Sequence, residues 1–298
     1  MNRINLLQFV LLSALFIFVS ACGSKSGEDA ADQNSEFEKA EDEQLKEHIE
    51  DVVYNIPSPS EIPYMLQSTG AEFNQSLLNS RDNASGYTTT SEKTAMNLGI
   101  YSTDIGYLIS YGKVQDALNY ITTSKGLADE LGIIGAFEQS VLVQFEKNLG
   151  NMDSLALLLN GAINKTSNFL KDDDRNKLAA LLLSGSLIEG LYISCELIRT
   201  YPTDILSEDE RTIILTELIR VILEQEKSVN DIIKMLSTIK GSDTVNELLV
   251  DFKSLEESYT KLDIQDKIQN NQGNLVFTDE NLKNITENVS KLRNRITE

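Results

Sequence analysis

The chain has 298 residues, and its 46 acidic side chains outnumber its 26 basic ones, which gives a formal net charge of −20 at pH 7. Such a surface repels nucleic acid and anionic lipid head groups, so the composition disfavours both as partners. The length suits one large domain or two small ones.

The N-terminus carries a short apolar run behind a single positive charge. Arg3 precedes a stretch from Leu6 to Val19 that is interrupted only by Gln8 and Ser13. A permanent membrane helix needs about 20 apolar residues, and this run has about 14. The pattern is therefore typical of an export signal, and residues 1–21 are predicted to be a signal peptide.

The end of that signal has four residues of recognisable type. Val19, Ser20, Ala21 and Cys22 resemble the lipobox of bacterial lipoproteins, in which the cysteine receives lipid and becomes the new N-terminus. The resemblance implies acyl chains such as palmitate on Cys22 and makes the membrane a partner of the protein. The alternative is a cysteine of an ordinary signal peptide or a disulfide with Cys195, the other cysteine of the chain.

Residues 22–35 are rich in Gly, Ser, Ala, Asp and Gln. A segment of this composition cannot bury enough apolar surface to offset its ordering, so it is predicted to be a flexible acidic tether. An Asp directly after the lipidated cysteine resembles an inner-membrane retention signal. Gly23 occupies that position here, which favours the outer membrane as the location. Acidic residues soon after the cysteine resemble the surface-export signal of Bacteroidota lipoproteins, but here Lys25 comes first and Glu28 follows only later. Both the periplasmic and the surface-exposed face of the membrane therefore stay possible.

Beyond the tether, helical periodicity dominates and strand patterns are nearly absent. We expect an all-α fold, an array of antiparallel helical hairpins that is either tetratricopeptide-like or an irregular bundle. Residues 36–200 would form an N-terminal helical array, and residues 201–298 would form C-terminal helices packed on it. The predicted helices cover residues 36–54, 61–69, 90–111, 113–131, 136–148, 152–170, 174–200, 207–225, 228–239, 243–263 and 279–297, and the only extended piece expected is Gly273–Phe277.

Two further resemblances concern the helical region. The segment Tyr111–Gly132 resembles one tetratricopeptide unit, although the following helices do not keep the period of about 34 residues. The stretches Ile56–Asn74, Asn97–Gly112 and Gly190–Ile198 together resemble a group of helical lipoproteins from Bacteroidota. That resemblance supports an envelope location and implies no activity.

The helix from Thr94 to Tyr111 contains one charged side chain, Asp104, in otherwise apolar, small or hydroxylated surroundings. It should be central and buried, and a buried carboxylate must be hydrogen-bonded or paired. Two interpretations stay open: neighbouring groups satisfy Asp104 structurally, or Asp104 belongs to a polar ligand pocket lined with tyrosines. The candidate ligand-binding residues on this helix share one stripe; they are Asn97, Tyr101, Asp104, Tyr107 and Tyr111.

A second apolar helix, from Leu178 to Ile198, repeats this design. It carries Glu189 and Glu196, with Tyr192 between them, and Gly185 and Gly190 would let a neighbour approach closely. Glu189 and Tyr192 complete the candidate ligand site. If the two helices face each other, Asp104 and Glu189 could form a carboxylate pair of the kind used in general acid and base catalysis.

Some local patterns predict how helices begin and pack. Thr89 with Glu92 matches the spacing of a capping box at a helix start. Cys195 should be a buried core residue. Two helices near the C-terminus carry apolar seams at alternating spacings of four and three, which either pack on each other or bind a partner. The seams are Leu248, Phe252, Leu255, Tyr259 and Leu262, and Leu282, Ile285, Val289, Leu292 and Ile296.

Signatures of catalysis are missing from the sequence. There is no Gly-x-Ser-x-Gly motif or Walker-type glycine loop, and the single histidine, His48, cannot serve a triad or a di-iron site. We therefore expect no enzyme activity, no cofactor and no metal. The sequence favours a lipid-anchored envelope protein that binds or scaffolds a protein partner, and the alternative is a small-ligand-binding lipoprotein.

Overall fold

The computed structural model describes residues 43–50, 52, 56–133, 139–172, 175–201, 208–262 and 280–298. Every regular element within these ranges is helical, which confirms the all-α class. Residues 43–50 form a first helix. The labelled elements are α3 (Glu61–Ser68), the 3-10 turns η1 (Gln75–Leu77) and η2 (Arg81–Tyr87), α4 (Ser91–Ser110), α5 (Val114–Glu130), α6 (Gln139–Lys147), α7 (Met152–Asp172), α8 (Asn176–Arg199), α9 (Glu208–Leu223), α10 (Glu226–Ser237), α11 (Asp243–Leu262) and α13 (Glu280–Thr297).

Several sequence-based predictions lie outside the described residues. They are the signal peptide at 1–21, the lipid attachment at Cys22, the tether at 22–35 and the extended piece at Gly273–Phe277. They stay predictions.

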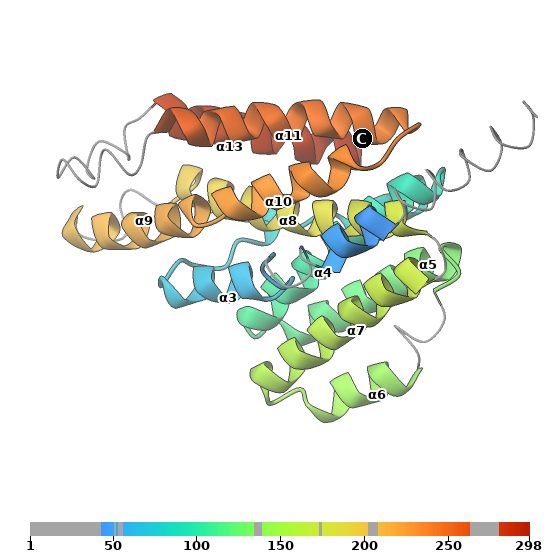
Figure 1. Ribbon diagram of the computed structural model, residues 1–298. Coiled ribbons are helices and arrows are strands. Elements are labelled where there is room, and N and C mark those ends of the chain that lie inside the picture. The colour runs from blue at the N-terminus through green and yellow to red at the C-terminus, as the bar shows by residue number, and fades with distance from the viewer. Residues whose placement is uncertain are drawn as a thin grey trace, which may run out of the picture. The chain divides into compact units, whose positions relative to one another are not determined.

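Helices α4 and α8 form the centre of the bundle. They make the most extensive helix pair, and α8 also contacts α3, α7, α9, α10 and α13 (Figure 1). Helix α8 is long and apolar enough to cross a membrane, but 94% of its most apolar window is buried among the other helices. Such burial is what the core helix of a bundle requires.

Glycine allows the central pair to approach backbone to backbone. A methyl group on Gly99 would overlap with the carbonyl oxygen of Leu182, and one on Gly185 would overlap with that of Met96. Beside this contact, the Thr103 hydroxyl donates to the Ser186 carbonyl over 3.0 Å. The close approach predicted for Gly185 is therefore confirmed, and its partner is α4.

The connection from α4 to α5 is a tight turn. Gly112 adopts a positive φ of 68°, a backbone conformation that glycine reaches without strain. The tetratricopeptide-like segment Tyr111–Gly132 thus consists of this turn and α5. In a repeat solenoid each unit contacts only its neighbours, whereas α8 packs on helices from distant parts of the chain. The arrangement is therefore an irregular bundle.

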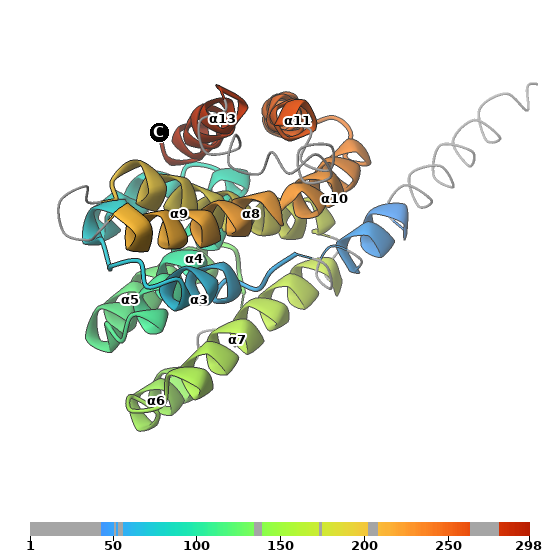
Figure 2. The same ribbon diagram turned by 90° about the vertical axis from the view of Figure 1, so that its left-hand side faces the viewer.

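Helices α11 and α13 lie side by side and antiparallel (Figure 2). All ten residues of the two predicted seams are buried. The interpretation that these helices pack on each other is confirmed, and α13 also packs on α8. Cys195 is buried as predicted, and burial raises the pKa of its thiol to about 12.

The start of α4 differs from the prediction by one residue. Thr90, not Thr89, is the N-cap, and its hydroxyl accepts from the Lys93 N–H over 3.1 Å. Glu92 does not fold back on the cap. Its carboxylate instead accepts hydrogen bonds from Lys177 and from the serine and threonine at the start of α11, so it ties three segments together.

Candidate functional site

The predicted tyrosine stripe of α4 faces the irregular segment between α3 and α4. Each hydroxyl pairs with the backbone of that segment, and burial raises the pKa of Tyr107 to about 12. The bonds run from Tyr101 to the Ser80 carbonyl (2.7 Å), from Tyr111 to the Ala71 carbonyl (2.8 Å) and from the Asn74 N–H to Tyr107 (2.9 Å). These tyrosines fasten residues 71–80 to the core, so their hydroxyls are already engaged.

Asp104 and Glu189 meet where α4 crosses α8. Both side chains have no exposed surface, and they are hydrogen-bonded to each other. Two like charges in a buried site cannot both persist, so such a pair retains a proton. The carboxylate pair that the sequence allowed is present in the folded chain.

The proton belongs mainly to Asp104. Burial and the neighbouring Glu189 carboxylate raise the pKa of Asp104 well above its usual 3.8. Asp104 Oδ2 accepts from the Asn79 N–H over 3.2 Å, whereas Oδ1 accepts no hydrogen bond from any described residue. Oδ1 is thus the oxygen that is left to carry the proton which the pair retains.

Arg293 completes this buried cluster from α13. Its Nε and Nη2 atoms donate to the two Glu189 oxygens over 3.1 and 3.3 Å, a bidentate pair. Burial raises the pKa of Glu189, and Arg293 opposes that rise. The guanidinium centre also lies 4.3 Å from the ring centroid of Tyr192. One cation, one carboxylate and one protonated carboxyl give a neutral cluster, called the carboxyl cluster below.

Asn97, another predicted site residue, serves the same junction. Its Nδ2 donates to the Ile296 carbonyl over 2.9 Å and to the Lys93 carbonyl over 3.0 Å. Asn97 and Arg293 therefore both attach α13 to the α4–α8 pair. Asp104 and Glu189 line neither of the two cavities described next, so the cluster binds three helices together.

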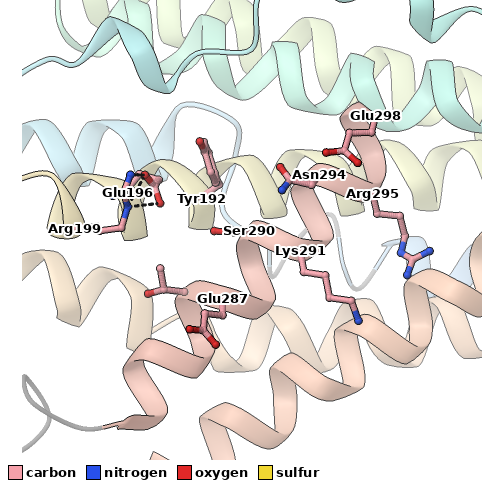
Figure 3. A pocket seen from close by; sticks show the side chains of 10 residues that line it. Tyr192, Glu196, Arg199, Glu287, Ser290, Lys291, Asn294, Arg295 and Glu298 are labelled. Atoms are coloured by element: carbon pink, nitrogen blue, oxygen red, sulfur yellow. Dashed lines mark hydrogen bonds and ion pairs between the residues drawn. The ribbon is translucent and has the colours of Figure 1, made fainter.

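A polar groove runs between α8 and α13 (Figure 3). Its volume is about 870 Å³, and it is open to solvent along one side. Of the seven predicted ligand-binding residues, Tyr192 is the one that lines it. The lining comprises Tyr192, Glu196 and Arg199 from α8, and Thr286, Glu287, Ser290, Lys291, Asn294, Arg295 and Glu298 from α13 and the end of the chain.

A second cavity lies between α3, α4 and α7, and we call it the α3–α7 cleft. Its volume is about 520 Å³, and Gly106, Ile109 and Ser110 of α4 form part of its lining. Large apolar side chains on its rim are exposed: Tyr64 at 58%, Met152 at 50% and Leu157 at 72%. The charged residues of the lining are Glu61 and Asp153.

Sequence reasoning missed Arg293 and the α3–α7 cleft. Helix α13 carries other basic residues besides Arg293, and nothing in the sequence marks one of them as buried. Only the tertiary arrangement distinguishes Arg293. Comparison with protein-family models, with curated proteins and with solved structures finds no match. Function must therefore be argued from the side chains themselves.

Proposed function

We propose that this protein is a lipid-anchored component of the bacterial cell envelope that binds another envelope protein through the α3–α7 cleft. The observation that carries the proposal is the exposure of Tyr64, Met152 and Leu157 around one concavity. Apolar side chains gathered in an exposed patch mark interaction surfaces, whereas single exposed apolar residues are ordinary.

The exposure of these side chains favours a protein over a small apolar ligand. A small-molecule pocket encloses roughly 70 to 90% of its ligand. Tyr64 and Leu157 are more than half exposed and stand on the rim, so a partner that covers them from outside would bury more of their surface. Large side chains of this kind are the usual anchors of protein interfaces.

The charge of the cleft indicates the chemistry of the partner. Glu61 and Asp153 are the charged residues of the described lining, and the whole chain carries a net charge of −20. Opposite charge steers association and fixes orientation. The partner segment should therefore present apolar anchors flanked by lysine or arginine.

A photo-reactive amino acid at position 157 tests this proposal in intact cells, with position 250 as the matched control. Val250 is also a large exposed apolar residue, at 63%, but it lies on α11. We expect one recurrent protein to cross-link through position 157 and not through 250, and its yield to fall when Asp153→Lys reverses the local charge. A cross-link that is equal at both positions, or that forms only with lipid, would reject the cleft as a protein-binding site.

The lipid anchor rests on the lipobox resemblance at Cys22 and has its own test. Cys22→Ser should abolish incorporation of labelled palmitate and leave an uncleaved precursor, because the sulfur that accepts lipid is gone. Incorporation into wild-type protein provides the reference. Normal maturation of the variant would end the lipoprotein proposal without affecting the cleft.

A further inference from the structure

The groove between α8 and α13 has two walls with regular spacing. Thr286, Ser290 and Asn294 follow one another at intervals of four on α13, so they form one polar stripe. Tyr192 and Glu196 stand on the opposite wall, on α8 (Figure 3). The groove thus offers hydrogen-bonding groups along its length and an aromatic ring beside them.

Two side chains of the stripe are available to a ligand. Within the part of the chain that the structure describes, Ser290 and Asn294 make no side-chain hydrogen bond, whereas the Thr286 hydroxyl donates to the Leu282 carbonyl. A hydroxyl and a carboxamide each offer both a donor and an acceptor. Such groups match ligand hydroxyls, which also donate and accept.

The charges of the groove do not select an ion. Three acidic and three basic residues line it, although the chain as a whole is strongly acidic. Arg199 is paired with Glu196 at 2.6 Å, and Lys291 and Arg295 both bind Asp251 of α11. An anionic ligand would have to displace one of these carboxylates, whereas a neutral ligand leaves the pairs intact.

Tyr192 is held in a fixed orientation. The Arg293 guanidinium lies against its ring, and the bidentate bond to buried Glu189 fixes that guanidinium in turn. A ring with little remaining freedom loses little entropy when a ligand packs on it. Aromatic rings combined with polar groups bind surfaces that are apolar on one side and hydroxylated on the other.

We infer that the groove between α8 and α13 binds a neutral oligosaccharide, with Tyr192 as the packing surface and Ser290 and Asn294 as hydrogen-bonding groups. An extended sugar chain suits an open groove because it can keep one side in water. Its hydroxyls match the stripe, and its lack of charge matches the paired ions. This site is separate from the α3–α7 cleft and does not depend on it.

A glycan array with neutral and charged oligosaccharides tests the inference directly. The full-length protein is purified from its cells in a detergent without a sugar head group and is applied to the array. We expect retention on neutral glycans, and calorimetry with the best of them should show an affinity at least about tenfold weaker for Tyr192→Ala and Asn294→Leu. Val250→Ala on α11 should bind like the wild type.

Asn294 is exposed, so Asn294→Leu keeps the inference testable if Tyr192→Ala disturbs folding. Melting temperatures of all three variants provide the control for folding. Retention on charged glycans alone, an array with no neutral glycan bound, or affinity that neither Tyr192→Ala nor Asn294→Leu changes would each overturn the inference.

Discussion

Helix α4 meets its surroundings in two contrasting ways. Towards α8 and α13 it buries Asp104 within the carboxyl cluster, where every charge is matched and both carboxyl groups have no exposed surface. Towards α3 and α7 it contributes to a cleft whose rim exposes Tyr64 and Leu157. The difference supports the proposed division of roles, in which ionisable groups stabilise the bundle and exposed apolar groups bind a partner.

The largest expected effect comes from removing the buried cation. Arg293→Met would leave the Glu189 carboxylate without a cation in the core, and a broken buried pair costs about 3 to 5 kcal/mol. Urea denaturation should show this loss in the free energy of unfolding.

Lys291→Met is the matched control on the same helix. Lys291 is exposed, and its partner Asp251 keeps the Arg295 bond, so we expect a loss below about 1 kcal/mol. Equal losses for the two variants would contradict a special role for the carboxyl cluster.

A smaller loss is expected where α4 and α8 touch through their backbones. Gly99→Ala places a methyl group against the Leu182 carbonyl, and overpacking of this kind costs about 2 to 3 kcal/mol. Gly126→Ala on α5 is the control, because no atom lies within 4 Å of the added methyl group. It should stabilise the protein by up to about 1 kcal/mol through helix propensity. Thermal unfolding of both variants measures the difference, and a neutral Gly99→Ala would refute the close contact.

The protonated carboxyl predicts a dependence on pH. The raised pKa of Asp104 means that its contribution to stability is fully present below pH 3.8, the usual value, and is lost as the pH rises through the folded-state value. Asp104→Asn keeps a donor towards Glu189 without proton uptake, so it should be more stable than wild type by about 1 kcal/mol at pH 8.

Melting curves at pH 5 and pH 8 measure this effect. We expect the advantage of Asp104→Asn to be larger at pH 8, because the wild type needs a bound proton there and the variant does not. An advantage that shrinks as the pH rises would show that Asp104 is not the protonated partner.

The buried carboxylates were predictable because each stands almost alone in a long apolar helix. Asp104 and Glu189 break otherwise uncharged faces, and burial then demands that each find a partner. The role of Arg293 was not predictable, because acidic and basic residues are spread along the whole of α13. Which of them faces α8 depends on how the two helices pack. The N-cap was misplaced for a related reason: Thr88, Thr89 and Thr90 carry the same side chain.

The α3–α7 cleft could not be predicted either. Tyr64 and Leu157 belong to segments far apart in the chain, and each alone is compatible with an ordinary amphipathic helix. Only the fold brings them around one concavity. Periodicity therefore identified the helices and the buried faces, whereas the surface sites required the tertiary structure.

The most direct test of the division of roles compares Tyr64→Ala with Asp104→Asn in the same cells. The protein cross-linked through position 157 is quantified for each variant, together with the free energy of unfolding of the purified protein. We predict that Tyr64→Ala lowers the cross-linked product about tenfold and leaves stability within about 0.5 kcal/mol of wild type. Asp104→Asn should change stability and leave the product unchanged. Undiminished product with Tyr64→Ala, or loss of product with Asp104→Asn, would contradict the account.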